Sequence, residues 1–442
     1  MIARARSVFD PPEEEGHRMA RRRLARATWL LLFPVASVLG SCDRIVSSRC
    51  DGAFVLPAGF CAQLFAENVG PARHVIVTAT GDVYVARWRE GSRVGGVLAL
   101  RDTNADGRAD IREEFGPEGG SGLALSGNAL FLGAWGKVYR WTLGAGLTPE
   151  GLPDVVVNGI PELEHGARSI AVGPDGALYV NIGAPSNACE RDYPRRDFRG
   201  DDPCDELSYS GGIWRFPGVL NAMGEPSRPA IANRFATGLR HTVALGLDTA
   251  DGRLYGAPHG IDHLHSWWPN SGYSARDAAA TPGETLFRIE NGRDYGFPYC
   301  LFDPAANRMV TSPAYNGQSR ETSRCASVPR PLAVLAAHSA PLALVVYRGT
   351  MFPPRFQGGL FVALHGSLFR APLDPTGYSV AFVSRHGDST FGVPERFADA
   401  LSARRFPLLG SRPRPSGLAV GPDGSLYVTD DNGGRIWRIV FR

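Results

Sequence analysis

The turn Pro174-Asp175-Gly176 leads into the apolar run Leu178-Tyr179-Val180, and nearly the same stretch returns as Pro422-Asp423-Gly424 before Leu426-Tyr427-Val428. Four further copies of a turn followed by a short apolar run end in Val83-Tyr84-Val85, Leu130-Phe131-Leu132, Leu254-Tyr255 and Leu360-Phe361-Val362. Tight turns before β-prone residues predict hairpins, and repetition of one such unit predicts a radial all-β fold. We therefore expect a six-bladed β-propeller with long loop insertions.

The amino-acid composition agrees with this fold and argues against one class of binding partner. The 442 residues include 53 Gly and 34 Pro, which suit many tight turns better than helices. The formal net charge is +3, and Lys137 is the single lysine. Because nearly balanced charge gives no electrostatic footprint for nucleic acid, we expect no nucleic-acid partner.

The N-terminal region predicts export. Arg21-Arg22-Arg23 precede an apolar run from Trp29 to Leu39, which is too short to span a bilayer and typical of a signal peptide. The run ends in Leu39-Gly40-Ser41-Cys42, which resembles a bacterial lipoprotein cleavage box with Cys42 as the lipidated residue. An ordinary secretory peptide with an incidental cysteine is the alternative.

These features divide the chain into three parts. Residues 1–41 form the signal peptide, with Met19 as a plausible true start. Residues 42–55 link the lipid anchor to the propeller, which residues 56–442 form. We expect a periplasmic lipoprotein that meets the membrane only through its lipid.

The remaining cysteines are even in number and fall in three couples that are local in sequence. An even count in an exported chain predicts disulfides, and the short separations make local pairing the economical choice. The couples are Cys50–Cys61, Cys189–Cys204 and Cys300–Cys325. A metal cluster is the alternative, but no ligand spacing of the C-x-x-C kind supports it. Since C-x-x-C-H is also missing, electrons collected by this protein would leave to an external acceptor.

One stretch matches the oxygen-rich pattern of a calcium loop. Alternate oxygen-bearing side chains can surround a hard cation, so the pattern predicts calcium binding, whereas a solvated hairpin between strands is the alternative. The residues are Asp102, Asn104, Asp106, Gly107, Asp110 and Glu113.

A second set of motifs resembles the quinoprotein glucose/sorbosone dehydrogenases from about Leu56 to Arg442. The ordered motifs are Leu56-Pro57-Ala58-Gly59-Phe60, His165-Gly166-Ala167-Arg168, Gly238-Leu239-Arg240-His241, Asp294-Tyr295-Gly296-Phe297-Pro298-Tyr299-Cys300, His338-Ser339-Ala340-Pro341-Leu342 and His365-Gly366-Ser367. The resemblance implies a propeller that holds pyrroloquinoline quinone and calcium and oxidises a small sugar, polyol or aldehyde.

The resemblance also implies roles for single residues. His165 would be the general base, and Arg240 would face the cofactor and stabilise its reduced oxygen. An imidazole with an ordinary pKa near ~6.5 would serve as this base without large tuning. Calcium would be held by backbone carbonyls at Gly260 and Ile261. Further cofactor contacts are expected at Glu164, Arg168, His241, His259, His365 and Arg414, and His338 is a weaker candidate.

The departures from the family pattern favour the sorbosone-dehydrogenase-like branch. The loop Ile182–Asn187 has no carboxylate where soluble glucose dehydrogenases carry a histidine-orienting aspartate, and His365 stands near the place of a cofactor-binding lysine. Two alternatives stay open. The chain could be a cofactor-free propeller that serves as a binding or scaffold lipoprotein, or a lactonase-like metal hydrolase.

Overall fold

The computed structural model describes residues 50–88, 95–190, 196–316, 321–367 and 369–442. Six four-stranded antiparallel sheets make up this part of the chain, together with a two-stranded hairpin. The predicted signal peptide, Cys42 and the first part of the predicted linker lie outside the described residues. No helix in the described ranges has the length and apolar character needed to cross a bilayer.

Each sheet is one blade, and in the first five blades the strands follow one another along the chain from the innermost outward, whereas in the last blade the outermost strand is β1. The first blade consists of β2 (Ala72–Val77), β3 (Val83–Arg87), β4 (Gly96–Arg101) and β5 (Ile111–Phe115). The second consists of β6 (Gly120–Ser126), β7 (Ala129–Ala134), β8 (Lys137–Thr142) and β9 (Asp154–Asn158). The third consists of β10 (Ile170–Val172), β11 (Leu178–Ile182), β12 (Gly212–Phe216) and β13 (Arg234–Thr237). The fourth blade consists of β14 (Ala244–Leu247), β15 (Leu254–Ala257), β16 (Glu284–Ile289) and β19 (Ala333–Leu335). The fifth consists of β20 (Pro341–Val346), β21 (Leu360–Leu364), β22 (Ser379–Val383) and β23 (Glu395–Asp399). The sixth consists of β24 (Pro415–Val420), β25 (Leu426–Asp430), β26 (Arg435–Phe441) and β1 (Phe60–Glu67).

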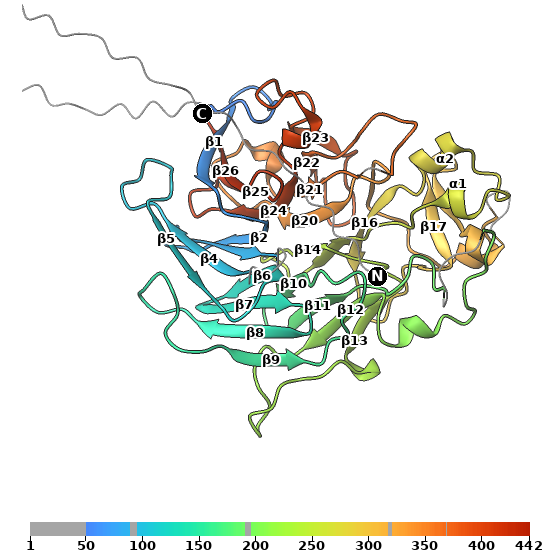
Figure 1. Ribbon diagram of the computed structural model, residues 1–442, viewed down its shortest axis with the longest axis horizontal. Coiled ribbons are helices and arrows are strands. Elements are labelled where there is room, and N and C mark those ends of the chain that lie inside the picture. Colours follow the sequence, from blue (N-terminus) through green and yellow to red (C-terminus); the bar gives the residue numbers. More distant parts are fainter. Residues whose placement is uncertain (1–49, 89–94, 191–195, 317–320, 368) are drawn as a thin grey trace, which may run out of the picture. The chain divides into compact units, whose positions relative to one another are not determined.

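The inner strands form a closed ring. Each contacts the inner strand of the next blade, in the order β2, β6, β10, β14, β20, β24 and back to β2. The first strand of the chain closes the last blade, because β1 pairs with β26 from Phe60 opposite Phe441 to Glu67 opposite Arg435. Figure 1 shows the blue β1 beside the red β26. This confirms the six-bladed propeller expected from the repeats.

The six repeats of the sequence are the second strands of the six blades. The apolar runs noted above begin or lie within β3, β7, β11, β15, β21 and β25, each after a turn from the inner strand. Their side chains are almost fully buried, as in the β21 strand, where every residue is buried. Sheet packing between blades therefore explains why these positions are apolar.

Two loop insertions carry the remaining elements. The β15–β16 loop contains helices α1 (Leu264–Trp267) and α2 (Ala275–Ala280), and the β16–β19 connection contains the hairpin of β17 (Cys300–Asp303) and β18 (Arg308–Thr311). They lie together at one side of the ring (Figure 1). A shared apolar cluster that includes Ile261, Trp268 and Tyr315 packs them against each other.

The folded unit begins earlier than the predicted boundary at residue 56. Ala53 and Phe54 are buried, Val55 forms a bridge with Asp399, and Asp51 donates its amide to the Ala62 carbonyl at 2.8 Å. The Cys50–Cys61 disulfide joins this segment to β1. Residues 50–55, which we assigned to a linker, are thus part of the propeller.

All three predicted disulfides are present. Cys50–Cys61, Cys189–Cys204 and Cys300–Cys325 close segments of 11, 15 and 25 residues. The last two lie in the β11–β12 and β16–β19 connections, where they fasten long insertions.

Candidate active site

The predicted site residues gather at the end of the channel where the inner strands begin. Because each second strand runs antiparallel to its inner strand, its last residue lies at this same end. Some of the residues at this end precede an inner strand or lie at its start, and others follow second strands. The first group is Arg73, His165, Arg240, His241, His338 and Arg414, and the second is Asn187, His259, Asp262, His365 and Asp431. Among them, Arg73, Asn187, Asp262 and Asp431 were not assigned a role from the sequence.

Three histidines form a row at this end. The ring centroids of His165 and His241 are 5.0 Å apart, and those of His241 and His259 are 5.3 Å apart. His165 Nδ1 lies 2.5 Å from the Ala184 carbonyl oxygen, and His259 Nε2 lies 2.8 Å from that of Pro341. Since a carbonyl can only accept, both of these ring nitrogens carry protons. Nε2 of His165 is therefore the nitrogen with a free lone pair when the ring is neutral.

Burial keeps this row uncharged. Burial and, after it, the Arg240 cation together lower the pKa of His165 to about 3. Burial also lowers the pKa of His259 to about 4 and brings that of His241 well below its usual value. The prediction that the His165 imidazole would keep an ordinary pKa is wrong, because the sequence does not reveal how completely the ring is desolvated.

Arg240 is held by a loop that the sequence motifs did not mark. Its guanidinium donates to the Gly260 carbonyl and to Asn187 Oδ1, each at 2.9 Å, and lies 3.5 Å from Asp262 Oδ2. Asn187 in turn accepts from the Asp262 amide and donates to the Asp262 carbonyl, both at 2.9 Å. Nε of Arg240 is buried without a partner in the described part of the chain, and so is Nε2 of His241. Asn187 thus joins two blades through Arg240 and Asp262.

Asp262 also binds the next predicted histidine. His338 Nδ1 lies 3.2 Å from Asp262 Oδ1, and its Nε2 lies 2.9 Å from the Ala278 carbonyl oxygen. Burial opposes the charge on both groups, but the hydrogen bonds to Asp262 and to the Ala278 carbonyl, together with the Asp262 charge, raise the pKa of His338. The same bond and the Arg240 charge lower the pKa of Asp262 to about 2. Both shifts favour the charged forms, an imidazolium on His338 and a carboxylate on Asp262.

A second charged group lies across the inner-strand ring. Asp431 accepts from Arg73 NH1 at 3.0 Å and from His365 Nε2 at 2.8 Å. Arg414 donates to the carbonyls of His365 at 3.1 Å and Gly366 at 2.5 Å. His365 and Arg414 were predicted, whereas Arg73 and Asp431 were missed because no motif surrounds them. Only their positions in the repeat could have indicated a place at the channel end: Arg73 is the second residue of an inner strand, and Asp431 directly follows a second strand.

Two predicted cofactor contacts are placed elsewhere. Arg168 is fully buried and donates to the backbone carbonyls of Trp135 at 2.9 Å, His165 at 3.2 Å and Pro161. It holds the loop that carries His165 and offers no surface to a ligand, so its assignment as a cofactor contact is corrected. Glu164 is exposed at the surface of this loop.

The predicted metal ligands do not converge. Gly260 gives its carbonyl to Arg240 and its amide to Glu284 Oε2 at 2.9 Å, so its oxygen is already paired, and Ile261 is buried in the apolar cluster of the insertions. In the oxygen-rich stretch, β4 and β5 form a hairpin, and the side chains accept from their own loop: Asp102 from the Gly107 amide, Asn104 from Asp106 and Asp106 from Arg108. Asp110 accepts from Thr103, and Glu113 points to Thr148 instead of the loop. These bonds are compatible with the hairpin alternative, and calcium binding by this stretch stays a prediction.

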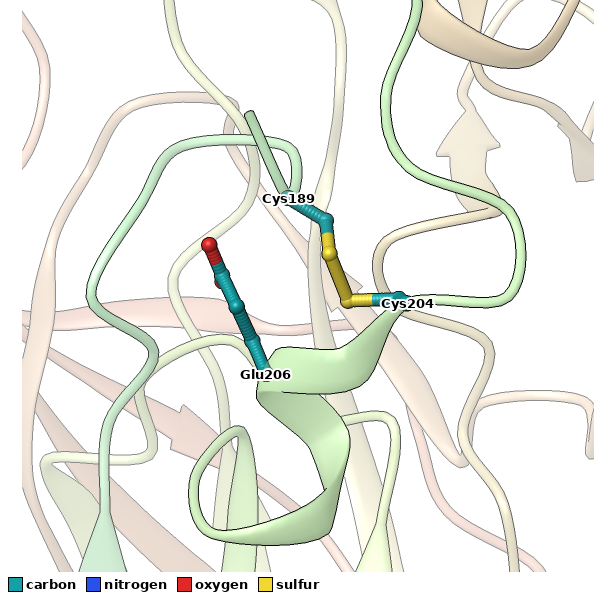
Figure 2. A group of neighbouring side chains, drawn as sticks. All are labelled: Cys189, Cys204 and Glu206. Atoms are coloured by element: carbon teal, nitrogen blue, oxygen red, sulfur yellow. A yellow bond between two sulfur atoms is a disulfide. The ribbon is translucent and has the colours of Figure 1, made fainter. Parts of the chain in front are cut away.

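One other group of potential ligands lies close together among the described residues, and it is not a metal site. Figure 2 shows Cys189, Cys204 and Glu206 as neighbours, with the two sulfurs joined in a disulfide. Disulfide sulfurs are poor ligands because a metal binds the thiolate. Glu206 instead accepts from Ser186 Oγ at 2.7 Å, which ties the disulfide to the loop that contains Asn187.

Comparison with known proteins identifies the family. The TrAA12-like family model matches residues 218–441, half of the chain, including Arg240, His338 and Arg414. This chain belongs to the TrAA12-like family. A curated but uncharacterised Borreliella burgdorferi protein is 27% identical over 213 residues, 47% of this chain, and the match spans about half (48%) of that protein.

Solved structures agree on the fold of this TrAA12-like chain. A calcium structure of a Trichoderma reesei carbohydrate-active enzyme of family AA12 has a TM-score of 0.70, with 18% identity over 88% of this chain and 98% of that chain. The holo pyranose dehydrogenase PQQ domain of Coprinopsis cinerea has a TM-score of 0.68, with 18% identity over 88% and 97%. The apo soluble aldose sugar dehydrogenase of Escherichia coli has a TM-score of 0.57, with 15% identity over 87% and 100%. The family model thus shows the family, and the solved structures confirm the expected propeller fold.

Proposed function

We propose that this TrAA12-like protein is a sugar dehydrogenase that uses pyrroloquinoline quinone. The observation that carries the proposal is the setting of His165, whose Nδ1–H is fixed on the Ala184 carbonyl so that Nε2 is a free base. Burial and Arg240 keep that ring neutral across the physiological range. A fixed neutral imidazole beside a fixed cation suits removal of a hydroxyl proton at a carbon that loses hydride.

The residues present fit an anionic quinone. Arg73, Arg240 and Arg414 bring three guanidinium groups to one end of the channel, and Arg240 Nε and His241 Nε2 are buried without partners in the described residues. Buried polar groups without partners are costly, so a bound ligand that pairs with them at this end would remove that cost. When bound, the quinone supplies the hydride acceptor.

The protein's own residues would then divide the work. His165 Nε2 accepts the hydroxyl proton of the substrate, while Arg168 holds the carbonyl of His165 and fixes its loop. Arg240 offers positive charge to a developing oxyanion, and Asn187 fixes the orientation of that guanidinium. The lowered pKa of His165 makes it a weak base in the empty site, and an anion paired with Arg240 would raise its basicity.

Calcium belongs to the proposal as the companion ion. It is supported by the calcium structure of the AA12 relative, but the paired Gly260 carbonyl argues against the ligands that we predicted. We propose a small sugar, polyol or aldehyde as substrate, an external electron acceptor, and the sorbosone-dehydrogenase-like branch. The hydrolase alternative gains no support, because histidines and carboxylates do not gather in a metal-binding group within the described ranges.

We also propose export and lipid anchoring. Three disulfides support an oxidising compartment, and Leu39-Gly40-Ser41-Cys42 supports a lipid at Cys42. A Cys42→Ser variant should become soluble and lose the mass of the lipid, whereas an unmodified wild-type protein by intact mass would contradict the anchor.

The enzymatic proposal is tested by adding pyrroloquinoline quinone to purified protein with and without calcium. Absorbance should report a bound quinone, and an aldose, polyol or aldehyde should then reduce a dye acceptor. Absence of both signals with every substrate class would refute the dehydrogenase and favour the cofactor-free binding module.

A further inference from the structure

A separate cavity of about 220 Å³ lies between the helical insertion and the β21–β22 loop. It adjoins the candidate active site through one shared side chain, because His338 lines the cavity and also binds Asp262, the partner of Arg240. Its walls come from α1, α2 and the β21–β22 loop. The residues that define it are His263, Leu264, Ala275, Ala278, His338 and Phe369.

The walls are apolar because their polar groups are already paired. His338 Nε2 donates to the Ala278 carbonyl at 2.9 Å, and Arg370 NH1 donates to the Ala279 carbonyl at 3.3 Å and to that of Ala337 at 3.0 Å. Four alanines, Leu264 and Phe369 line the cavity beside His265 and Ser266, whose polar atoms bond the carbonyls of Tyr273 at 2.9 Å and His263 at 3.3 Å. A ligand here would therefore meet mainly carbon atoms.

Aromatic rings stand at the opening. Phe369 is 50% exposed, and its ring lies 4.8 Å from that of His263. His263 in turn stacks on Trp267, with centroids 4.9 Å apart and planes at 18°. Within the described part of the chain, the ring nitrogens of His263 have no hydrogen-bond partner. The backbone of His263 is left-handed, with φ 65°, a conformation uncommon for a side chain of this size.

We propose that this cavity is a subsite for a second sugar ring of an oligosaccharide substrate, next to the ring that is oxidised. The proposal rests on the proposed dehydrogenase function. A pyranose has a C–H face that packs on alanine and aromatic surfaces and a hydroxyl edge that can bond to the imidazole of His263. The volume is below the range of about 300–1,000 Å³ usual for larger ligands, which fits one ring.

The imidazole of His263 distinguishes a sugar from a hydrocarbon group. An aryl or alkyl occupant would cover the ring nitrogens of His263 without bonding them, and a buried unpaired polar group costs about 1–3 kcal/mol. A sugar hydroxyl avoids that cost. The subsite therefore prefers a disaccharide to a monosaccharide and to a simple aromatic molecule.

The test measures binding to the full mature protein without quinone, so that it does not depend on turnover. Cellobiose, maltose, glucose and phenol are titrated by calorimetry, with saturation-transfer NMR for weak binding. We expect one of the disaccharides to bind about tenfold more tightly than glucose. A tenfold gain is the size expected when the second sugar ring packs on one aromatic side chain and buries its surface.

Two variants on α2 provide the matched comparison. Ala275 lines the cavity and is exposed, so Ala275→Trp should fill the subsite and abolish the preference for the disaccharide while leaving glucose binding unchanged. Arg276 is exposed on the same helix but does not line the cavity, so Arg276→Trp should keep the preference. Phe369→Ala should reduce disaccharide affinity about tenfold.

Three results would overturn the subsite: equal binding of disaccharides and glucose, tighter binding of phenol, or an unchanged preference in Ala275→Trp. Failure of the dehydrogenase would appear separately, as the absence of a bound-quinone spectrum. A protein that binds the quinone but shows no disaccharide preference would keep the proposed function and lose the subsite.

Discussion

His165 is kept neutral by two effects that act in the same direction. Burial removes water from the imidazole, and the Arg240 cation opposes a second positive charge nearby. Residue types and motif order predicted several of the side chains that meet at the channel end, but missed Arg73 and Asp431 and wrongly included Arg168. They did not predict the pKa of His165 or the role of Asn187, because both depend on how completely two separate loops exclude water.

Replacing His165 by Ala should reduce turnover by about 10²–10⁴-fold, the usual contribution of a positioned general base. Quinone binding should change little, because the arginines that face the cofactor keep their partners. Turnover is measured with a dye acceptor, and affinity by absorbance titration. The control is His386→Ala, which removes an exposed histidine that follows β22 and bonds Ser384 Oγ at 2.9 Å. A variant with full turnover would exclude His165 as the base.

His74 provides a test of buried imidazoles by pH. Its Nε2 lies 2.8 Å from the Leu342 carbonyl oxygen, and burial lowers its pKa from 6.5 to about 4. Because the unfolded chain binds this proton more readily, the stability due to neutral His74 is present above pH 6.5 and is lost as pH falls toward 4. The loss approaches about 3 kcal/mol, at about 1.4 kcal/mol for each pKa unit.

A His74→Gln variant should therefore lack this part of the acid sensitivity. Urea unfolding of both proteins at pH 7 and pH 4.5 gives the comparison, in which the wild type should lose more stability than the variant. Equal losses would mean that His74 titrates normally in the folded protein.

At the scale of elements, the strands followed from the sequence more closely than the insertions did. The six turn-and-strand repeats correspond to the second strands of the six blades, since each combines a tight turn with residues buried on both sheet faces. The sequence does not decide between a hairpin and a calcium site in the oxygen-rich stretch, because a hairpin of exposed Asp and Asn uses the same residues as a calcium loop. The role of Asn187 in the β11–β12 loop could not be predicted, because its partners Arg240 and Asp262 are far from it in the sequence.

The Cys189–Cys204 disulfide gives that loop a testable role. Replacing both cysteines by Ser should cost up to ~3 kcal/mol of stability, as expected for a closed segment of 15 residues. It should also weaken quinone binding, because Asn187 lies two residues from Cys189 and holds Arg240. Replacing Cys300 and Cys325 by Ser is the matched control, which should cost similar stability without changing quinone affinity. Equal effects of the two double variants on affinity would separate the disulfide from the site.

At the scale of the whole molecule, closure of the ring depends on strands from opposite ends of the chain. β1 completes the last blade by pairing with β26, and the segment before β1 packs against the end of β23 through Val55 and Asp399. The channel inside the ring contains a cavity of about 410 Å³, lined by inner strands of all six blades. A closed ring keeps the ends of these strands at fixed distances, so the site residues of different blades keep their geometry only while the ring is closed.

Phe60 tests this closure directly. Its ring, at the start of β1, lies 4.8 Å from Phe352, 4.9 Å from Phe397 and 4.9 Å from Phe441, so it joins the last two blades. Phe60→Ala should cost about 3 kcal/mol, the lower end for a core phenylalanine because this ring is half-buried. Phe369→Ala, at an exposed ring, should cost far less. Urea unfolding followed by fluorescence and by circular dichroism should remain one coincident transition at lower urea, because opening the ring removes support from every blade. Two separate transitions would show that the blades unfold independently and that β1 does not control the stability of the ring.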